Sequence, residues 1–295
     1  LKTPEEIAEL ARAADLSGGM HLAAMRLARP GMTERELAAR VVEIALAAGA
    51  EVSRPTVLTT HGEILRNPCQ DLVLESGRMV LVQAGAGSPC GYAGDLSSAF
   101  PVDRTFSARQ KEIYLIVLRA LKDTVAALKP GTLFQKAHLQ ACRSLVEGLQ
   151  TLGLMKGNVE EAVAIGAHDL FFPHGVGHML GLEAEDMGDL GEAWAGYEGG
   201  PRRKVPPSRS LARRMAPGFV LTLEPGLYFS PDRIDHWRAD HRFVEFIDYP
   251  RLEPYRAFGG IRIGENYAMM EQGPQRLGQS LPRVPSDIEV VRGAS

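Results

Sequence analysis

The apolar positions follow a helical period in four segments, and a polar start signal precedes three of them. Thr3 and Glu6 form a capping box, with a proline at the first helical position. Thr33 and Glu36 form a second capping box, and Ser107 opens a third helix. We expect helices from Pro4 to near Pro30, from Glu34 to Gly49, from Ala108 to near Lys129, and over roughly 133–151.

Stretches rich in β-branched and aromatic residues lie between and after these helices. They predict strands at about 54–60, 78–84, 92–101, 219–229 and 259–270. The stretch 196–217 instead combines glycines and prolines with several basic residues, which is typical of a surface loop. We interpret it as a solvated basic loop, and binding of an acidic partner is the alternative.

One short pattern occurs twice along the chain. The sequence Arg29-Pro-Gly-Met-Thr33 precedes one expected helix, and Lys129-Pro-Gly-Thr132 precedes another, at an offset of 100 residues. A period this long does not fit a solenoid and instead predicts two related halves. Chance similarity of a Pro-Gly turn before a helix is the alternative.

Composition changes this picture little but excludes several classes of protein. The chain has 295 residues, of which 45% are hydrophobic, so it can bury a sizeable core. A formal net charge of -3 favours neither nucleic acid nor an anionic membrane as a partner. Apolar runs such as 44–48 and 79–82 fall far short of the roughly 20 residues that span a membrane.

Three cysteines, Cys69, Cys90 and Cys142, show no metal-ligand spacing among themselves. We expect ordinary packed or exposed thiols, and their odd, sparse number suits a reducing compartment such as the cytoplasm. The polar start of the chain predicts a helix rather than a signal peptide. Because Leu1 stands where an initiator Met is expected, we also expect that a segment precedes it.

Candidate chemistry lies in three separate places. His174 and His178 stand four apart around two glycines, a pattern that serves a metal or a polarised carbonyl, although a structural role is the alternative. Glu224 ends an apolar run before Pro225 and Gly226, and Asp95 lies among small residues. Taken alone, each acid is more simply a surface residue. Together with imidazole, the two carboxylates are the ligands that divalent cations prefer.

Several motifs, in order, resemble one family. These are Thr59-Thr-His-Gly-Glu-Ile-Leu-Arg-Asn67, Phe172-Pro-His-Gly-Val-Gly-His-Met-Leu-Gly-Leu182, Pro217-Gly-Phe-Val-Leu-Thr-Leu-Glu-Pro-Gly-Leu-Tyr-Phe229 and Phe258-Gly-Gly-Ile-Arg-Ile263. The chain resembles the creatinase, Xaa-Pro aminopeptidase and methionine aminopeptidase superfamily, and most closely its prolidase-like branch. The resemblance implies an α+β pita-bread fold with an internal pseudo-twofold, formed by a single domain over 1–295. It also implies that the branch's N-terminal domain is absent from this chain.

The resemblance further implies a two-metal site of two Asp, one His and two Glu. Asp95, His178 and Glu224 match three of these positions, whereas Gln83 and Gly264 occupy the other two. Around the pocket, Pro68 and Glu185 stand where histidines are usual, and Ser97-Ser98 replaces a Thr-Arg pair.

Two carboxylates carry too little charge for two divalent cations, and stranded positive charge is costly at low dielectric. Glu265 does not substitute for the missing Glu, because successive strand residues point to opposite faces unless a bulge intervenes. We therefore expect either no metal or one weakly held Mn, Co or Zn ion on Asp95, His178 and Glu224.

Three functions follow from these expectations. The first is an active Xaa-Pro aminopeptidase or dipeptidase with a reduced metal site. The second is a non-catalytic relative that binds peptides, and the third is other C–N hydrolysis or lyase chemistry on the same fold. Candidate catalytic residues are Glu224, His174 and Glu185, and candidate substrate contacts are His174, Arg262 and Tyr92. The expected partner is a peptide, and the branch resemblance suggests a homodimer.

Overall fold

A computed structural model describes residues 1–67, 71–187 and 213–293. Its long helices begin where the capping signals predict: the boxes at Thr3, Thr33 and Ser107 each have both reciprocal hydrogen bonds. The α-helices are α1 (Pro4–Leu27), α2 (Glu34–Ala47), α3 (Ala108–Ala127), α4 (Phe134–Thr151), α5 (Val159–Ala164), α6 (Pro231–Ala239), α7 (Tyr249–Leu252) and α8 (Pro285–Gly293). Short 3-10 turns η1 (Ala167–Leu170) and η3 (Glu253–Tyr255) accompany them.

In the part of the chain that the structure describes, the strands form three antiparallel sheets. The first has the order β1 (Val57–Thr59), β2 (Met79–Ala84), β3 (Leu96–Pro101). The second has the order β4 (Val220–Leu223), β7 (Glu265–Met270), β8 (Gly273–Arg276), and the third pairs β5 (Gly226–Phe229) with β6 (Gly259–Arg262). A bridge between Ser97 and Gly264 connects the first sheet to the strands of the second half.

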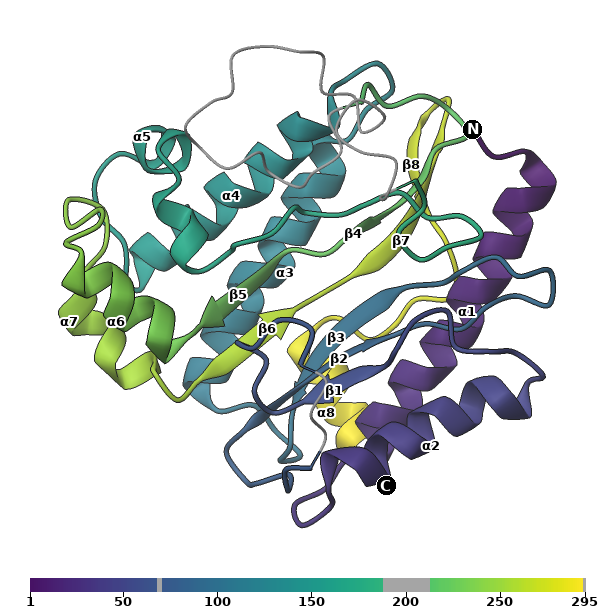
Figure 1. The fold of residues 1–295 in the computed structure, drawn as a ribbon, viewed down its shortest axis with the longest axis horizontal. Helices are drawn as coiled ribbons and strands as arrows, with labels where there is room; N and C mark the ends of the chain where they lie inside the picture. Colours follow the sequence, from purple (N-terminus) through teal and green to yellow (C-terminus); the bar gives the residue numbers. More distant parts are fainter. Residues whose placement is uncertain (68–70, 188–212, 294–295) are drawn as a thin grey trace.

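Helices from each half cover the sheets. In the described residues, α1 packs against β2 and β3, whereas α3 packs against β4, β5 and β6 (Figure 1). The helices also pair with each other, α1 with α2 and α3 with α4. One hydrophobic core runs through both halves and includes Leu58, Phe100, Phe134, Phe171 and Phe229.

The repeated Pro-Gly turn has the same structure in both halves. Gly31 and Gly131 adopt left-handed backbone angles, with φ of 90° and 77°. Each donates its N–H to a distant carbonyl, Gly31 to Leu74 and Gly131 to Met215. The two helices that follow, α2 and α4, end at further left-handed glycines, Gly49 and Gly153. The predicted relation between the halves is therefore present in the backbone.

Two of the stretches predicted as single strands each contain two separate strands. The stretch 219–229 divides at Glu224 and Pro225, and the stretch 259–270 divides at Ile263 and Gly264. At both points the chain leaves one sheet and enters another, since β4 pairs with β7 while β5 pairs with β6. Pro225 has no N–H to continue a ladder, which accounts for the first break. The short elements α5 to α8 and β8 carry weaker signals and were not predicted.

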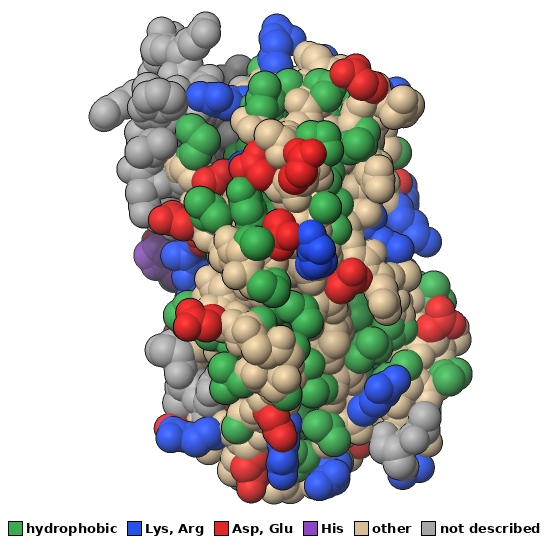
Figure 2. All heavy atoms as spheres, turned by 90° about the vertical axis from the view of Figure 1, so that its right-hand side faces the viewer, with side chains coloured by type: hydrophobic (Ala, Val, Ile, Leu, Met, Phe, Trp, Pro, Cys, Tyr) green, Lys and Arg blue, Asp and Glu red, His purple; other side chains and the backbone are tan. Residues whose placement is uncertain are grey.

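The surface is electrically mixed. Figure 2 shows the side on which α1 lies, where acidic and basic side chains alternate with hydrophobic ones. No helix among the described residues is long and apolar enough to cross a membrane. The basic loop expected at 196–217 lies mostly outside the described residues, as does Pro68.

Candidate active site

The breaks between sheets bring the chemistry-bearing positions together. Glu224 lies between β4 and β5, and Arg262 ends β6. Gln83 lies on β2, and Asp95 immediately precedes β3, which pairs with β2. His178 is held beside β4 by hydrogen bonds between its backbone and Thr222. Segments more than 100 residues apart in sequence thus supply one cluster.

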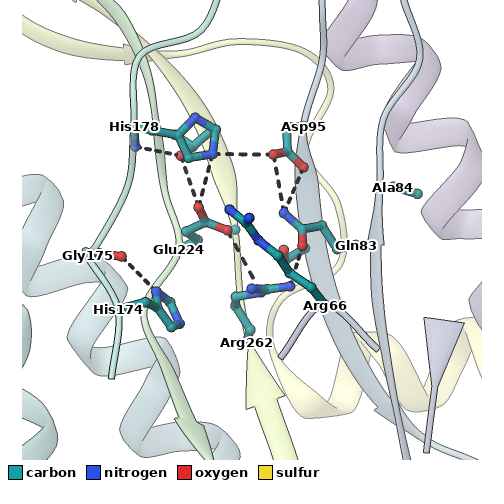
Figure 3. A network of polar contacts seen from close by, with 12 residues as sticks. Arg66, Gln83, Ala84, Asp95, His174, Gly175, His178, Glu224 and Arg262 are labelled. Atoms are coloured by element: carbon teal, nitrogen blue, oxygen red, sulfur yellow. Dashed lines mark hydrogen bonds and ion pairs between the residues drawn. The ribbon is translucent and has the colours of Figure 1, made fainter. Parts of the chain in front are cut away.

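Five side chains form a closed ring of polar contacts (Figure 3). His178 Nε2 lies 3.2 Å from Glu224 Oε1 and 3.4 Å from Asp95 Oδ2. Gln83 Nε2 donates to both oxygens of Asp95 at 3.3 Å, and Gln83 Oε1 accepts from Arg262 Nη2 at 2.6 Å. Arg262 Nε closes the ring 3.8 Å from Glu224 Oε2. We call these residues the polar ring.

A second arginine neutralises the ring from its edge. Arg54 Nη1 contacts Asp95 Oδ2 at 2.5 Å, and the Asp95 side chain is only 2% exposed. Arg54 also lies 3.6 Å from Glu185, which accepts a 2.7 Å hydrogen bond from Arg66. Each ring carboxylate therefore has an arginine partner. Glu185 and Arg66 are the solvent-exposed members of this group, at 45% and 67% side-chain exposure.

Gln83 and Gly264, the two positions at which we expect metal ligands to be missing, lie side by side with Ser97. Gln83 pairs with Ser97 across β2 and β3, and Ser97 pairs with Gly264 through the bridge. Directly opposed residues in antiparallel strands face the same side, so these three positions share the face of the ring. A Cβ on Gly264 would lie 2.9 Å from the Ser97 amide nitrogen, closer than ordinary contact.

Glu265 points to the other face, as strand alternation predicts. Its carboxylate accepts hydrogen bonds from Tyr267 Oη at 2.5 Å and from Arg283 Nε at 3.1 Å. Among the described residues, its hydrogen bonds and ion pairs are with Tyr267, Arg276 and Arg283, not with Asp95, His178 or Glu224. Glu265 thus takes no part in the polar ring.

The ring fixes its own protonation states. Burial by itself lowers the pKa of His178, but hydrogen bonds and charge from Asp95 and Glu224 outweigh burial and raise it to about 10. Burial likewise favours a protonated Glu224, yet His178 and Arg262 hold its pKa well below the usual range. His178 Nδ1 donates to the Met179 carbonyl, which leaves Nε2 for the carboxylates. His178 is therefore an imidazolium cation between two carboxylates.

His174 stands beside the ring in its neutral form. Burial, together with the nearby Arg262 charge, lowers its pKa to about 4. Its Nδ1 donates to the Gly175 carbonyl at 2.8 Å, so Nε2 accepts the 2.7 Å hydrogen bond from the Tyr228 hydroxyl. Burial raises the pKa of Tyr228 to about 12, which keeps that hydroxyl protonated. Both nitrogens of His174 are therefore already engaged.

The donor set does not fit a pair of divalent cations. The ring holds only two carboxylates, and three cations already face them, namely Arg54, Arg262 and protonated His178. Among the described residues, Asp95, His178 and Glu224 do not form a trio whose ligand atoms lie within 4.8 Å of one another. A cation entering here would add positive charge to a buried cluster that has its own counter-ions.

The remaining expected residues lie at different places. The Tyr92 hydroxyl donates a 2.8 Å hydrogen bond to Glu6 of α1, so it contacts that helix and not the ring. Sequence reasoning missed Arg54 and Tyr228, because their roles depend on partners 41 and 54 residues away. The only local signal is a charged residue, Arg54, at the start of an otherwise apolar stretch.

Comparison with known proteins places this geometry in context. The sequence matches the model of metallopeptidase family M24 over residues 8–271. It is 34% identical over 297 residues to the Xaa-Pro aminopeptidase of Escherichia coli (strain K12), covering 100% of this chain and 59% of that relative. It is 33% identical to the human Xaa-Pro dipeptidase, covering 98% of this chain and 59% of the relative. The chain thus spans about three fifths of these relatives.

Solved structures of an aminopeptidase are also similar to this chain over nearly its whole length. A variant of Escherichia coli aminopeptidase P in complex with substrate superposes with a TM-score of 0.83 at 34% identity, covering 99% of this chain and 59% of that one. The zinc-substituted form of that protein in complex with product superposes with a TM-score of 0.82 at 35% identity, with the same coverage.

Proposed function

The chain belongs to metallopeptidase family M24, and from this membership we propose that it is a peptide-binding relative of the Xaa-Pro peptidases in which protein cations replace the metal ions. Its α+β pita-bread fold and its kinship with Xaa-Pro peptidases follow from the comparisons. We infer the activity of this chain from its polar ring.

One observation carries the proposal: both carboxylates of the ring are paired with arginines, Asp95 with Arg54 at the edge of the ring and Glu224 with Arg262 within it. Asp95 has Arg54 at 2.5 Å, and Glu224 has Arg262 at 3.8 Å. In a two-metal peptidase, the ions would activate water and polarise the scissile carbonyl. Gln83 and Gly264 remove two of the five ligands for those ions, and the arginines supply the positive charge that carboxylates need when buried. We therefore infer either no metal at this site or one weakly held ion of Mn, Co or Zn.

Side chains beside the ring support peptide recognition in the absence of metal ions. Glu185 and Arg66 lie beside the ring, are exposed, and offer charged partners for the ends of a short peptide. His174 and Tyr228 form a rigid neutral pair next to Glu224, so they suit contact with a peptide carbonyl or ring rather than proton transfer. We also propose that the protein acts in a reducing compartment such as the cytoplasm, which its free Cys90 and Cys142 support, and that it works as a homodimer.

Calorimetry and product analysis with the tripeptide Ala-Pro-Ala test this function. We expect saturable binding without release of free alanine, whether Mn²⁺ or EDTA is present. The substitution Arg66→Gln should weaken binding several-fold, because a charged partner is lost. Arg12→Gln is the matched control, since Arg12 is equally exposed but pairs with Glu9 on α1.

Three outcomes would contradict the proposal. Mn²⁺-dependent turnover that disappears in Glu224→Ala would identify an active peptidase with a reduced metal site. Turnover that persists in excess EDTA would identify metal-free C–N hydrolysis. A lack of any binding would exclude peptide recognition at this site.

A further inference from the structure

A second cluster of ligand-type side chains lies in the core, apart from the polar ring. His138 and Cys142 lie on α4, and His168 lies on η1. All three are buried, at 6%, 0% and 7% exposure. One ligand atom from each lies within 4.8 Å of the others, and this is the one such trio among the described residues. The fold thus gives Cys142 partners that the cysteine spacing alone did not reveal.

The spacing within the trio suits a tetrahedral metal ion. His138 and Cys142 are four residues apart, so they lie on the same face of α4, one turn above the other. His138 Nε2 is 3.6 Å from Cys142 Sγ. A zinc ion bound tetrahedrally at about 2.3 Å from sulfur and 2.0–2.1 Å from nitrogen holds those two atoms about 3.6 Å apart. A simple thiol–imidazole hydrogen bond has a similar length, so other observations must distinguish the two.

One unpartnered nitrogen belongs to this cluster. Nδ1 of His168 is buried and has no hydrogen-bond partner in the described structure, whereas Nε2 of the same ring lies near Asp169. A buried nitrogen without a partner costs about 1–3 kcal/mol, so it calls for an explanation. A bound ion would satisfy Nδ1 of His168, and His138 would bind the same ion through Nε2, the nitrogen beside Cys142.

Neighbouring groups supply orientation and charge. Asp169 Oδ1 lies 3.4 Å from His168 Nε2. A carboxylate on the second nitrogen of a ligating imidazole is typical of metal sites, because it fixes the ring. Burial lowers the pKa of His138 to about 3, so that ring is in the neutral, ligating form. A thiolate at Cys142 and the Asp169 carboxylate would together offset the two charges of the cation.

We propose that His138, Cys142 and His168 bind one Zn²⁺ ion. Binding releases the thiol proton of Cys142 to solvent and forms one Zn–S and two Zn–N bonds, with the fourth position open to water. The ion would tie η1 to α4. The His138 ring packs against Phe172 at a centroid distance of 5.8 Å, and Phe172 packs edge-to-face against His174 at 4.7 Å. The ion would therefore also stiffen the segment that carries His174.

Cobalt provides the direct test, since Co²⁺ bound to a thiolate absorbs in the near ultraviolet. Protein stripped with EDTA under reducing conditions should bind one Co²⁺ per chain with this charge-transfer band, and Zn²⁺ should displace it. The band should vanish in Cys142→Ser, and His138→Gln should weaken Co²⁺ binding at least about tenfold. It should remain in Cys90→Ser, which alters an exposed thiol, and in Glu224→Ala, which alters the polar ring.

The wild-type measurement keeps the proposal falsifiable even where a variant fails to fold. Absence of the band in wild-type protein would overturn it, as would a band of unchanged strength in Cys142→Ser. Added Zn²⁺ should also raise the melting temperature of the wild type and of Cys90→Ser but not that of Cys142→Ser. Equal shifts in all three would place the ion elsewhere.

Discussion

At the scale of single residues, each carboxylate of the polar ring has a cation placed beside it. Sequence reasoning identified Gln83 and Gly264 as departures and Asp95, His178 and Glu224 as the remaining ligand types, and the structure brings these last three together around His178. It did not find Arg54, because no local pattern links that residue to Asp95. Ion-pair partners depend on the fold, whereas a missing carboxylate is visible in a motif.

The pair of Arg54 and Asp95 should contribute strongly to stability. Removing one partner of a buried ion pair leaves an uncompensated charge, so Arg54→Met should lower the free energy of unfolding by about 3 kcal/mol. The exposed pair of Arg35 and Asp71 gives the control, and Arg35→Met should change stability by less than about 1 kcal/mol. Urea denaturation measures both. Equal effects would show that Asp95 does not need its arginine.

The amide of Gln83 should keep cations out of the ring. It donates to Asp95 and accepts from Arg262, so Gln83→Asp replaces a satisfied amide with a second carboxylate beside the first. Repulsion between neighbouring carboxylates favours an added cation, and we expect Mn²⁺ affinity to rise at least about tenfold. Electron paramagnetic resonance of free Mn²⁺ measures this rise. Gln275→Asp on exposed β8 is the matched control, and an equal affinity in both variants would argue against the role of Gln83.

At the scale of elements, the capping signals at helix starts predicted the structure better than the patterns inside the apolar stretches did. The three capping boxes located α1, α2 and α3 because each is a local hydrogen-bond pattern that sequence alone specifies. The division of 219–229 and 259–270 into separate strands was not predicted, since apolar character continues through both breaks. Those breaks decide the site, because they move Glu224 and Gly264 between sheets.

The contact of α1 with the first sheet should depend on pH through His21. This buried residue donates from Nε2 to the Ala84 carbonyl on β2 and accepts from Ser98 on β3. Burial lowers its pKa from 6.5 to about 4. The unfolded chain therefore binds a proton that the native protein excludes, and stability falls as pH drops below about 6.5.

This residue alone should reduce the free energy of unfolding by roughly 2 kcal/mol between about pH 7 and pH 5. In His21→Gln, which keeps a donor and an acceptor but does not titrate, the pH dependence should be smaller by that amount. His236→Gln, at an exposed position, should leave it unchanged. Thermal or urea unfolding across this range measures the difference, and identical slopes in His21→Gln and wild type would refute the assignment.

At the scale of the whole molecule, the chain retains the family's architecture. Two related halves, each with a helix pair and its sheets, supply the residues of the polar ring. The core that supports them does not depend on the ions, because it is built from apolar side chains of both halves. A fold can therefore persist when its original site changes.

Counting Mn²⁺ ions at the polar ring tests the central claim most directly. Mn²⁺ prefers oxygen ligands, so it distinguishes the ring from the thiolate-containing cluster on α4. Titration followed by electron paramagnetic resonance should show no tightly held Mn²⁺ in wild-type protein, and Glu224→Ala should remove at most one weakly held ion. Stoichiometric binding in wild type that is lost in Glu224→Ala would contradict the account, because the arginines would then not have replaced the metal ions.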